Sequence, residues 1–278
     1  MRIDAHQHFW KFDPVRDAWI DDSMAGLRRD FLPPHLQPRL AAAGMAGCVA
    51  VQADQSLAQN DFLLDLAARH TFIRGVVGWV DLRSPDVDVQ LERYADRDRF
   101  VGVRHVVQDE QAGFMDDPAF RRGIGRLAAY GLTYDILIRD HQLEEAVRLA
   151  SAFPEQPFVL DHLAKPRVNE ALYTAWERPL RALAALPNVC CKVSGLVTEA
   201  PGYDWSYGTI LPFIRVAADA FGPDRLLYGS DWPVCRAATD YAGQLSVTDR
   251  AFGDYSPTER AAIFGGNAVR FYGLADPS

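Results

Sequence analysis

Short apolar runs rich in β-branched residues alternate along the chain with segments of helical periodicity. Apolar runs of this kind are typical of parallel strands buried on both faces, and the periodic segments predict the helices that connect them. The predicted strands span residues 2–8, 47–53, 73–80, 100–107, 132–138, 158–163, 189–196 and 225–230. The predicted helices span 33–44, 60–70, a segment opening at 84, 118–130, 141–153, 170–186, 205–221 and 256–272.

Strict alternation of eight strands with eight helices implies parallel strands joined by helical crossovers. Eight such units in 278 residues predict an α/β fold of the (β/α)8 TIM-barrel type, as one domain over residues 1–278. A doubly wound open sheet is the competing fold, and it would carry a glycine-rich phosphate loop after its first strand. The segment His6-Gln7-His8-Phe9-Trp10 at that position contains no glycine, which favours the barrel.

The amino-acid composition indicates which classes of partner the protein binds and where in the cell it lies. The net charge of -8 argues against a nucleic-acid partner, which would require a basic face. The chain has no run of ~20 apolar residues, so we expect no membrane span, and its first residues do not resemble a signal peptide. None of the four cysteines forms a Cys-x-x-Cys pair, so we expect reduced thiols in a cytoplasmic protein. They are Cys48, Cys190, Cys191 and Cys235.

Polar residues gather where the predicted strands end, which is the face of such a barrel that carries active sites. Each residue has a structural explanation by itself; Asp231, for example, fits a helix N-cap, and His162 a hydrogen-bonded core histidine. Four of them, however, can bind a metal or transfer a proton, and they come from three strands that share one mouth. They are His6, His8, His162 and Asp231. The sequence therefore predicts one convergent site.

The motifs around these residues resemble the amidohydrolase superfamily, and within it the lactonase-like group called amidohydrolase 2. They are Asp4-Ala5-His6-Gln7-His8-Phe9-Trp10, Val103-Arg104-His105, Leu160-Asp161-His162-Leu163-Ala164-Lys165-Pro166, Cys191-Lys192-Val193-Ser194-Gly195-Leu196, Tyr228-Gly229-Ser230-Asp231-Trp232-Pro233-Val234 and Phe264-Gly265-Gly266-Asn267-Ala268. The resemblance covers the whole chain. It implies a hydrolase of lactones, because the group acts on L-fuconolactone, L-rhamnonolactone, sulfomuconolactone and a pyrone dicarboxylate.

The resemblance also bears on metal content. Binuclear members of the superfamily carry a bridging Lys or Glu on the fourth strand and a His on the fifth. Here the fourth strand ends in Arg104-His105 and the fifth contains Tyr134-Asp135. We therefore expect at most one divalent ion, with Zn²⁺ as the candidate and His6, His8, His162 and Asp231 as its ligands. Some relatives work without metal, so a metal-free site is the alternative.

The resulting hypothesis is hydrolysis of a lactone ring. Asp231 takes a proton from the attacking water, and His6, His8 and His162 stabilise the oxyanion, either through Zn²⁺ or as direct donors. Asp161 orients Lys165 or a ligand histidine. The groups expected to hold substrate hydroxyls or a carboxylate are Arg104, His105, Lys165 and Lys192. The aromatic walls expected for a sugar ring are Trp10, Trp79 and Trp232.

The class of lactone follows from the basic residues at the strand ends. A dicarboxylate would require several bidentate arginines, whereas the strand ends offer only Arg104 and Arg139, with Lys165 and Lys192 as point charges. We therefore expect a neutral sugar lactone such as L-fuconolactone or L-rhamnonolactone. The alternatives are an anionic lactone, a metal-dependent decarboxylase on the same barrel, and a non-catalytic sugar-binding barrel. A homodimer through the barrel helices is compatible with the sequence, which carries no direct sign of an assembly.

Overall fold

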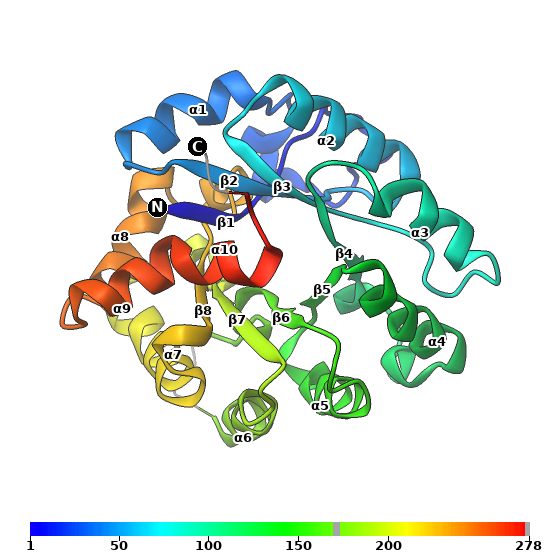
Figure 1. Ribbon diagram of the computed structural model, residues 1–278. Coiled ribbons are helices and arrows are strands. Elements are labelled where there is room, and N and C mark those ends of the chain that lie inside the picture. The colour runs from blue at the N-terminus through cyan, green and yellow to red at the C-terminus, as the bar shows by residue number, and fades with distance from the viewer. Residues whose placement is uncertain (169–172, 276–278) are drawn as a thin grey trace.

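The computed structural model describes residues 1–168 and 173–275 of the chain. Eight parallel strands form one sheet in the order β1 to β8, with helices around them (Figure 1). The strands are β1 (Ile3–Gln7), β2 (Gly47–Val51), β3 (Ile73–Gly78), β4 (Phe100–Val106), β5 (Thr133–Leu137), β6 (Phe158–Leu160), β7 (Val189–Val193) and β8 (Leu226–Tyr228). The predicted (β/α)8 barrel is confirmed, and every predicted strand is present, each ending one to three residues earlier than predicted.

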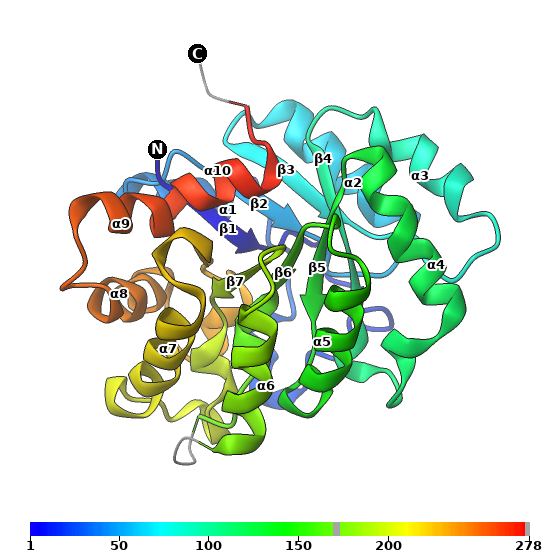
Figure 2. The same cartoon turned by 60° about the horizontal axis from the view of Figure 1, so that its bottom comes forward.

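Helices cover the outside of the sheet, as both ribbon views show (Figures 1 and 2). They are α1 (Pro33–Ala42), α2 (Leu57–Arg69), α3 (Val87–Ala95), α4 (Pro118–Leu127), α5 (Leu143–Ala152), α6 (Thr174–Ala184), α7 (Tyr207–Phe221), α8 (Tyr241–Ala251), α9 (Pro257–Ala261) and α10 (Asn267–Tyr272). The start of the helix predicted over 170–186 lies outside the described residues. Among the described residues, every helix is too short or too polar to cross a membrane.

Two helical predictions need correction. The helix α8 was not predicted, because its small and polar residues and its internal Gly243 weaken the periodic pattern. The helix predicted over 256–272 is interrupted by a π-helical segment, Ala262–Gly266. This segment packs against the chain start, where a Cβ on Gly265 would lie 2.2 Å from the carbonyl oxygen of Met1. The close approach requires glycine and explains why a regular helix does not continue.

The barrel closes between its first and last strands through the segment after β8. The amide of Asp231 donates to the carbonyl of His6 at 2.8 Å, and the amide of His8 donates to the carbonyl of Trp232 at 2.7 Å. These bonds extend the pairing of β1 beyond the short β8. Since Asp231 lies three residues after the end of β8, the closure brings its carboxylate beside His6 of β1 and His8, which follows that strand.

The barrel interior has an apolar floor and a charged layer. A compact apolar group, which contains Val49, Val159 and Leu227 from the strands, packs with Tyr272 of α10 at the end where β1 begins. In both views α10 lies across that end (Figures 1 and 2). Strand register places Arg104, Asp135 and Val159 side by side, so their side chains share one face. Charged side chains therefore lie inside the barrel above an apolar floor.

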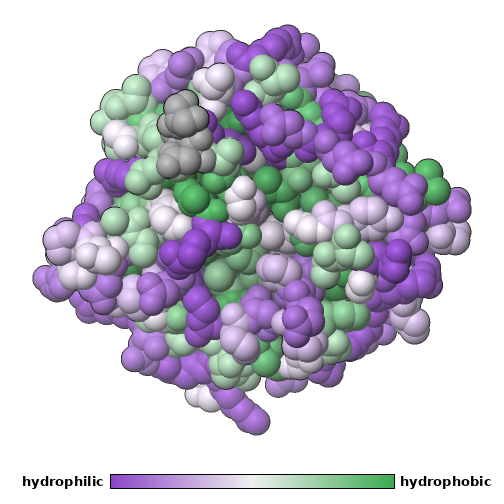
Figure 3. Space-filling model, in the orientation of Figure 1, coloured by the Kyte–Doolittle hydropathy of each residue, from purple (hydrophilic) through white to green (hydrophobic). Residues whose placement is uncertain are grey.

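The outer surface has an ordinary distribution of polarity on the face seen in Figure 3. Hydrophilic residues dominate the periphery of this face, and apolar residues are interspersed nearer its middle (Figure 3). The large hydrophobic side chains that are exposed, Met1, Val15, Trp19 and Val89, are scattered along the chain. Scattered apolar residues of this kind need no partner to explain them. The face in Figure 3 is the one on which α10 lies, away from the carboxyl ends of the strands.

Candidate active site

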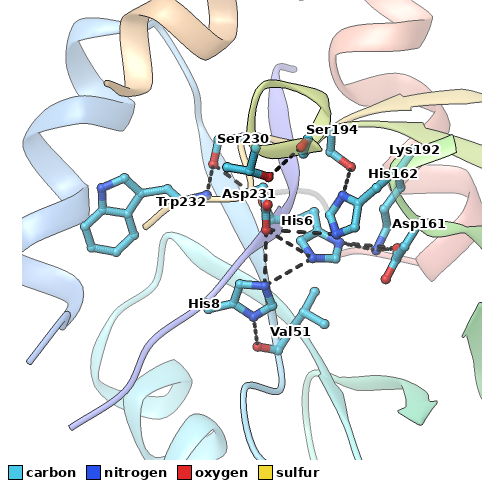
Figure 4. Close-up of polar contacts among 12 residues, drawn as sticks. His6, His8, Val51, Asp161, His162, Lys192, Ser194, Ser230, Asp231 and Trp232 are labelled. Carbon is cyan, nitrogen blue, oxygen red and sulfur yellow. Dashed lines mark hydrogen bonds and ion pairs between the residues drawn. The ribbon is translucent and has the colours of Figure 1, made fainter. Parts of the chain in front are cut away.

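His6 of β1, His8 just after that strand and Asp231 in the segment after β8 form the centre of the site (Figure 4). The Nε2 atoms of His6 and His8 lie 3.2 Å apart. The Oδ1 atom of Asp231 lies 3.4 Å from Nε2 of His8 and 3.8 Å from Nε2 of His6. Nδ1 of His8 donates to the carbonyl of Val51 at 2.9 Å, so the lone pair of this imidazole lies on Nε2. The three atoms therefore face one common point.

These three atoms match the donor set of a zinc ion. Zinc–ligand bonds of ~2.0–2.1 Å imply ligand–ligand distances of about 3.3–3.4 Å in a tetrahedron. The separations of 3.2, 3.4 and 3.8 Å between the three donor atoms lie close to that value. The geometry of His6, His8 and Asp231 therefore suits one divalent ion. His162 is not a member of this triad; it groups with His6 and Asp161.

His162 reaches the site from an unusual turn after β6. Four consecutive non-glycine residues, 162–165, have positive φ angles of 50–59°. The left-handed backbone directs the His162 ring toward His6, with ring centroids 4.5 Å apart, and places Nε2 4.0 Å from Oδ1 of Asp231. Nδ1 of His162 forms a hydrogen bond with the hydroxyl of Ser194 at 2.8 Å. A Cβ on Gly195 would lie 2.5 Å from this nitrogen, so the ring position requires glycine there.

Burial sets the protonation of these groups. Burial lowers the pKa of His6 well below its ordinary value and lowers the pKa of His162 to about 4, so both rings are neutral at pH 7. Burial alone would raise the pKa of Asp231, but the nearby rings of His162, His8 and His6 hold it below its usual range. An ionised carboxylate beside neutral imidazoles is the state that a divalent ion requires.

A layer of buried charge lies beneath the triad. Arg104 Nη1 contacts Asp161 Oδ2 at 3.1 Å, and its Nη2 donates to the carbonyl of Gln52 at 2.6 Å. The Lys192 ammonium, which has no exposed surface, lies between Asp135 and Asp161 and 3.1 Å from Nδ1 of His6. Each charge has an opposite partner, which is the usual condition for burying charge.

Above the triad opens a cavity of about 420 Å³. His8, His162 and Asp231 line its inner end. Side chains from the ends of the strands and from the loops that follow them form the rest of its lining. They are Trp10, Trp19, Met24, Gln52, Ala53, Arg104, Val106, Gln108, Asp109, Leu137, Arg139, Lys165, Thr198, Glu199, Tyr203 and Val234. This volume suits a small ligand such as a monosaccharide derivative.

Comparison with known proteins agrees with this geometry. A sequence model of the amidohydrolase family matches residues 3–274. The chain belongs to this family. It is 40% identical to an L-fucono-1,5-lactonase of Burkholderia multivorans, over all of this chain and 98% of that protein. It is 38% identical to an L-fucono-1,5-lactonase of Burkholderia ambifaria, over all of this chain and 97% of that protein. The crystal structure of an amidohydrolase from Burkholderia multivorans with bound zinc superposes with a TM-score of 0.95 at 39% identity, over 99% of this chain and all of that one.

In this amidohydrolase the predicted site residues divide into two groups. His6, His8, His162 and Asp231 converge, and Trp10, Arg104 and Lys165 line the cavity above them. The other predicted substrate contacts lie elsewhere. They are Trp79, His105, Lys192 and Trp232, none of which lines the cavity.

The reason is the same for all four: protein partners occupy their polar groups or enclose their rings. Trp79 Nε1 donates to Nδ1 of His105 at 3.2 Å, while Nε2 of His105 faces Glu110 at 2.8 Å. Trp232 is fully buried against Phe9 and Phe31. The substrate-binding roles predicted for these residues therefore do not fit the structure. Asp161 contacts His6 rather than Lys165, so only the second of its two predicted roles matches.

Several residues that line the cavity were not among the predicted site residues. Trp19 and Tyr203 come from the loops after β1 and β7, and the hydroxyl of Tyr203 is 3.1 Å from that of Ser23. Glu199 lies 3.5 Å from Lys165, on a different loop. An aromatic residue in a long loop after the first strand was the available signal for Trp19. The pairing of Glu199 with Lys165 had no local signal, because it depends on the fold.

Proposed function

We propose that this amidohydrolase opens the ring of a neutral sugar lactone of the L-fucono-1,5-lactone type, releasing the aldonic acid. The two Burkholderia relatives named L-fucono-1,5-lactonase, at about 40% identity over nearly their whole lengths, support the reaction. The convergence of His6, His8, His162 and Asp231 on one cavity supports a catalytic rather than a purely binding role.

The ion pairs around the cavity support a neutral substrate rather than an anionic one. Each arginine or lysine that lines the cavity lies near a carboxylate. Arg104 pairs with Asp161 at 3.1 Å, Lys165 with Glu199 at 3.5 Å, and Arg139 with Asp109 at 3.7 Å. A substrate carboxylate would have to compete with these partners. The hydroxyls of a sugar lactone instead find both donors and acceptors around them.

In the proposed mechanism, Asp231 orients the attacking water and accepts its proton. Because the pKa of Asp231 is held low, the carboxylate is ionised in the resting site and passes the proton on to the ring oxygen that leaves. His162 faces the same position with a neutral ring and stabilises charge that develops on the carbonyl oxygen. A zinc ion on His6, His8 and Asp231 would supply Lewis-acid polarisation of the lactone carbonyl when bound.

A panel of lactones tests this proposal through proton release. We expect turnover of L-fucono-1,5-lactone and other neutral aldonolactones, and at least tenfold lower kcat/KM for lactones that carry a carboxylate. Preference for the carboxylate-bearing lactones, or release of CO2 from an aromatic acid without lactone turnover, would overturn it. Asp231→Asn is expected to lower kcat by ~10²–10⁴-fold, as for loss of a general base. Asp109→Asn makes the same substitution at the cavity wall and is the matched control. We expect its kcat to change by only a few fold.

Two further expectations concern the cellular compartment of the protein and its partners. The four cysteines are free thiols, which supports the proposed location in a reducing compartment such as the cytoplasm. The acidic net charge of -8 supports the absence of a nucleic-acid partner. Thiol titration of the protein purified from its cellular compartment, with all four cysteines reactive after unfolding, checks the first expectation.

A further inference from the structure

Lys192 is a fully buried lysine that the proposed reaction does not use. Its ammonium donates hydrogen bonds to Asp135 and to Nδ1 of His6, the latter at 3.1 Å. It also lies 3.0 Å from Oδ1 of Asp161, but without the alignment of a hydrogen bond. An ammonium can donate and cannot accept. The hydrogen bond between Lys192 and His6 therefore requires that Nδ1 of His6 is the acceptor.

The partners of His6 fall into two sets that require opposite positions of the ring proton. A proton on Nε2 suits Lys192, which donates to Nδ1 at 3.1 Å, and His8, whose Nε2 can accept at 3.2 Å. A proton on Nδ1 suits Asp161, whose Oδ1 lies 3.3 Å from that nitrogen, and Arg104, whose Nη1 lies 3.4 Å from Nε2. A neutral imidazole satisfies only one set at a time. The shorter distances belong to the set that contains Lys192.

The two arrangements differ in their capacity for metal. With the proton on Nε2, His6 has no lone pair to offer at the point shared with His8 and Asp231. With the proton on Nδ1, donated to Asp161, the lone pair lies on Nε2, as in the common carboxylate–histidine–metal arrangement. Oδ1 of Asp161 is buried and has no hydrogen-bond partner among the described residues. It is therefore available to accept that proton.

We propose that Lys192 is a positioning residue that holds His6 with its proton on Nε2 and thereby weakens the binding of a divalent ion. Occupation of the site moves the proton from Nε2 to Nδ1, with no change in the number of protons on His6. The ring then donates to Asp161, and Lys192 remains hydrogen-bonded to Asp135. The inference concerns the metal triad and holds whichever lactone is hydrolysed.

The test uses a variant that removes the donor without leaving a buried charge unpaired. The double variant Lys192→Met with Asp135→Asn removes one positive and one negative charge, so the net charge near the triad is unchanged. The amide oxygen at position 135 can still accept from Tyr272, which donates to Asp135 in the native protein. Zinc affinity is measured by competition with a chromophoric chelator. We expect at least tenfold tighter binding by the double variant and unchanged binding by Lys11→Met, an exposed lysine.

A spectroscopic measurement on the metal-free native protein reports the tautomer directly. Long-range ¹H–¹⁵N spectra, with His6 assigned through a His6→Asn variant, should show a protonated Nε2 on His6 in the native protein and a protonated Nδ1 in the double variant. A protonated Nδ1 in the metal-free native protein would overturn the proposal. So would equal or weaker zinc binding by a double variant that unfolds at a temperature near that of the native protein. If the double variant does not fold, the native spectrum alone decides.

The variant Asp161→Asn tests the same competition by changing the other partner of Nδ1 of His6. It replaces the carboxylate that would accept a proton from Nδ1 with a neutral amide, which is a weaker acceptor, so we expect zinc binding to weaken by ~10–100-fold, as for loss of other such partners. Tighter binding by this variant would contradict the proposed competition for Nδ1.

Discussion

Ion pairs occur both in the interior of the barrel and along the walls of the cavity, but their surroundings differ. Inside, Arg104 pairs with Asp161, and the exposed fractions of the two side chains are 5% and 0%. At the wall, Arg139 pairs with Asp109, with exposed fractions of 46% and 61%. Breaking a buried pair by removing one partner typically costs ~3–5 kcal/mol, whereas an exposed pair contributes about 0–1 kcal/mol. The interior pairs therefore constrain the catalytic groups, while the wall pairs can change with little cost in stability.

Truncation of one arginine in each place tests this difference most strongly. Arg104→Met leaves Asp161 with one fewer cation in the interior, and we expect the free energy of unfolding to fall by about 3–5 kcal/mol. Arg139→Met should lower it by less than about 1 kcal/mol. Urea unfolding of both variants, followed by circular dichroism, measures the two values. Similar losses in the two variants would show that burial does not distinguish these pairs.

The second prediction uses pH to measure the cost of burying a carboxylate. Burial raises the pKa of Asp4 to about 6, although Ser230, His6 and Tyr241 donate hydrogen bonds to it. The folded protein thus binds this proton more tightly than the unfolded chain, in which the pKa of the aspartate is 3.8. Stability from this group is present below pH 4 and is lost as the pH rises through 6, by about 3 kcal/mol. The loss of stability from burying the ionised carboxylate should therefore persist at pH 7.

Asp4→Asn removes the titration and keeps an oxygen that accepts from the same amides. We expect the free energy of unfolding of this variant, relative to the native protein, to increase by about 2 kcal/mol between pH 4 and pH 7. Asp116→Asn is a control with the opposite sign, since Arg148 holds the pKa of Asp116 below its ordinary value. Its relative stability should fall as the pH rises toward 4 and change little between pH 4 and pH 7, where this carboxyl is ionised in both the folded and the unfolded state. A flat difference for Asp4→Asn would exclude a raised pKa in the folded state.

The smallest expected effect concerns the aromatic wall of the cavity. Trp19 is 44% exposed and touches Trp10 edge-on, with ring centroids 5.9 Å apart. Loss of an aromatic contact worth about 1 kcal/mol predicts a KM for the neutral lactone some 3–10-fold higher for Trp19→Ala. The value of kcat and the free energy of unfolding should change little, and Trp19→Phe should retain most of the affinity. Steady-state kinetics would contradict this role if kcat fell and KM did not change.

Most of the fold and the centre of the site were predictable from the sequence. The eight strands repeat as apolar runs, and their order places His6, His8, His162 and Asp231 at the same end of the barrel. The wall residues Tyr203 and Glu199 were harder to predict, because loop residues reach the cavity through contacts between distant segments. Helix α8 was missed because its apolar face is weak, and its helical state depends on packing against α7 and the loop after β8.

By itself, the sequence determined the alternation of strands and helices and the chemistry at the strand ends, because both depend on local periodicity. Only the tertiary structure decided which polar groups meet substrate and which are enclosed. Lys192 and Trp232 resemble site residues in the sequence, yet one is fully paired inside the barrel and the other is packed beneath a loop. Their roles differ because burial and pairing depend on what neighbouring strands and loops contribute, and local sequence does not encode those neighbours.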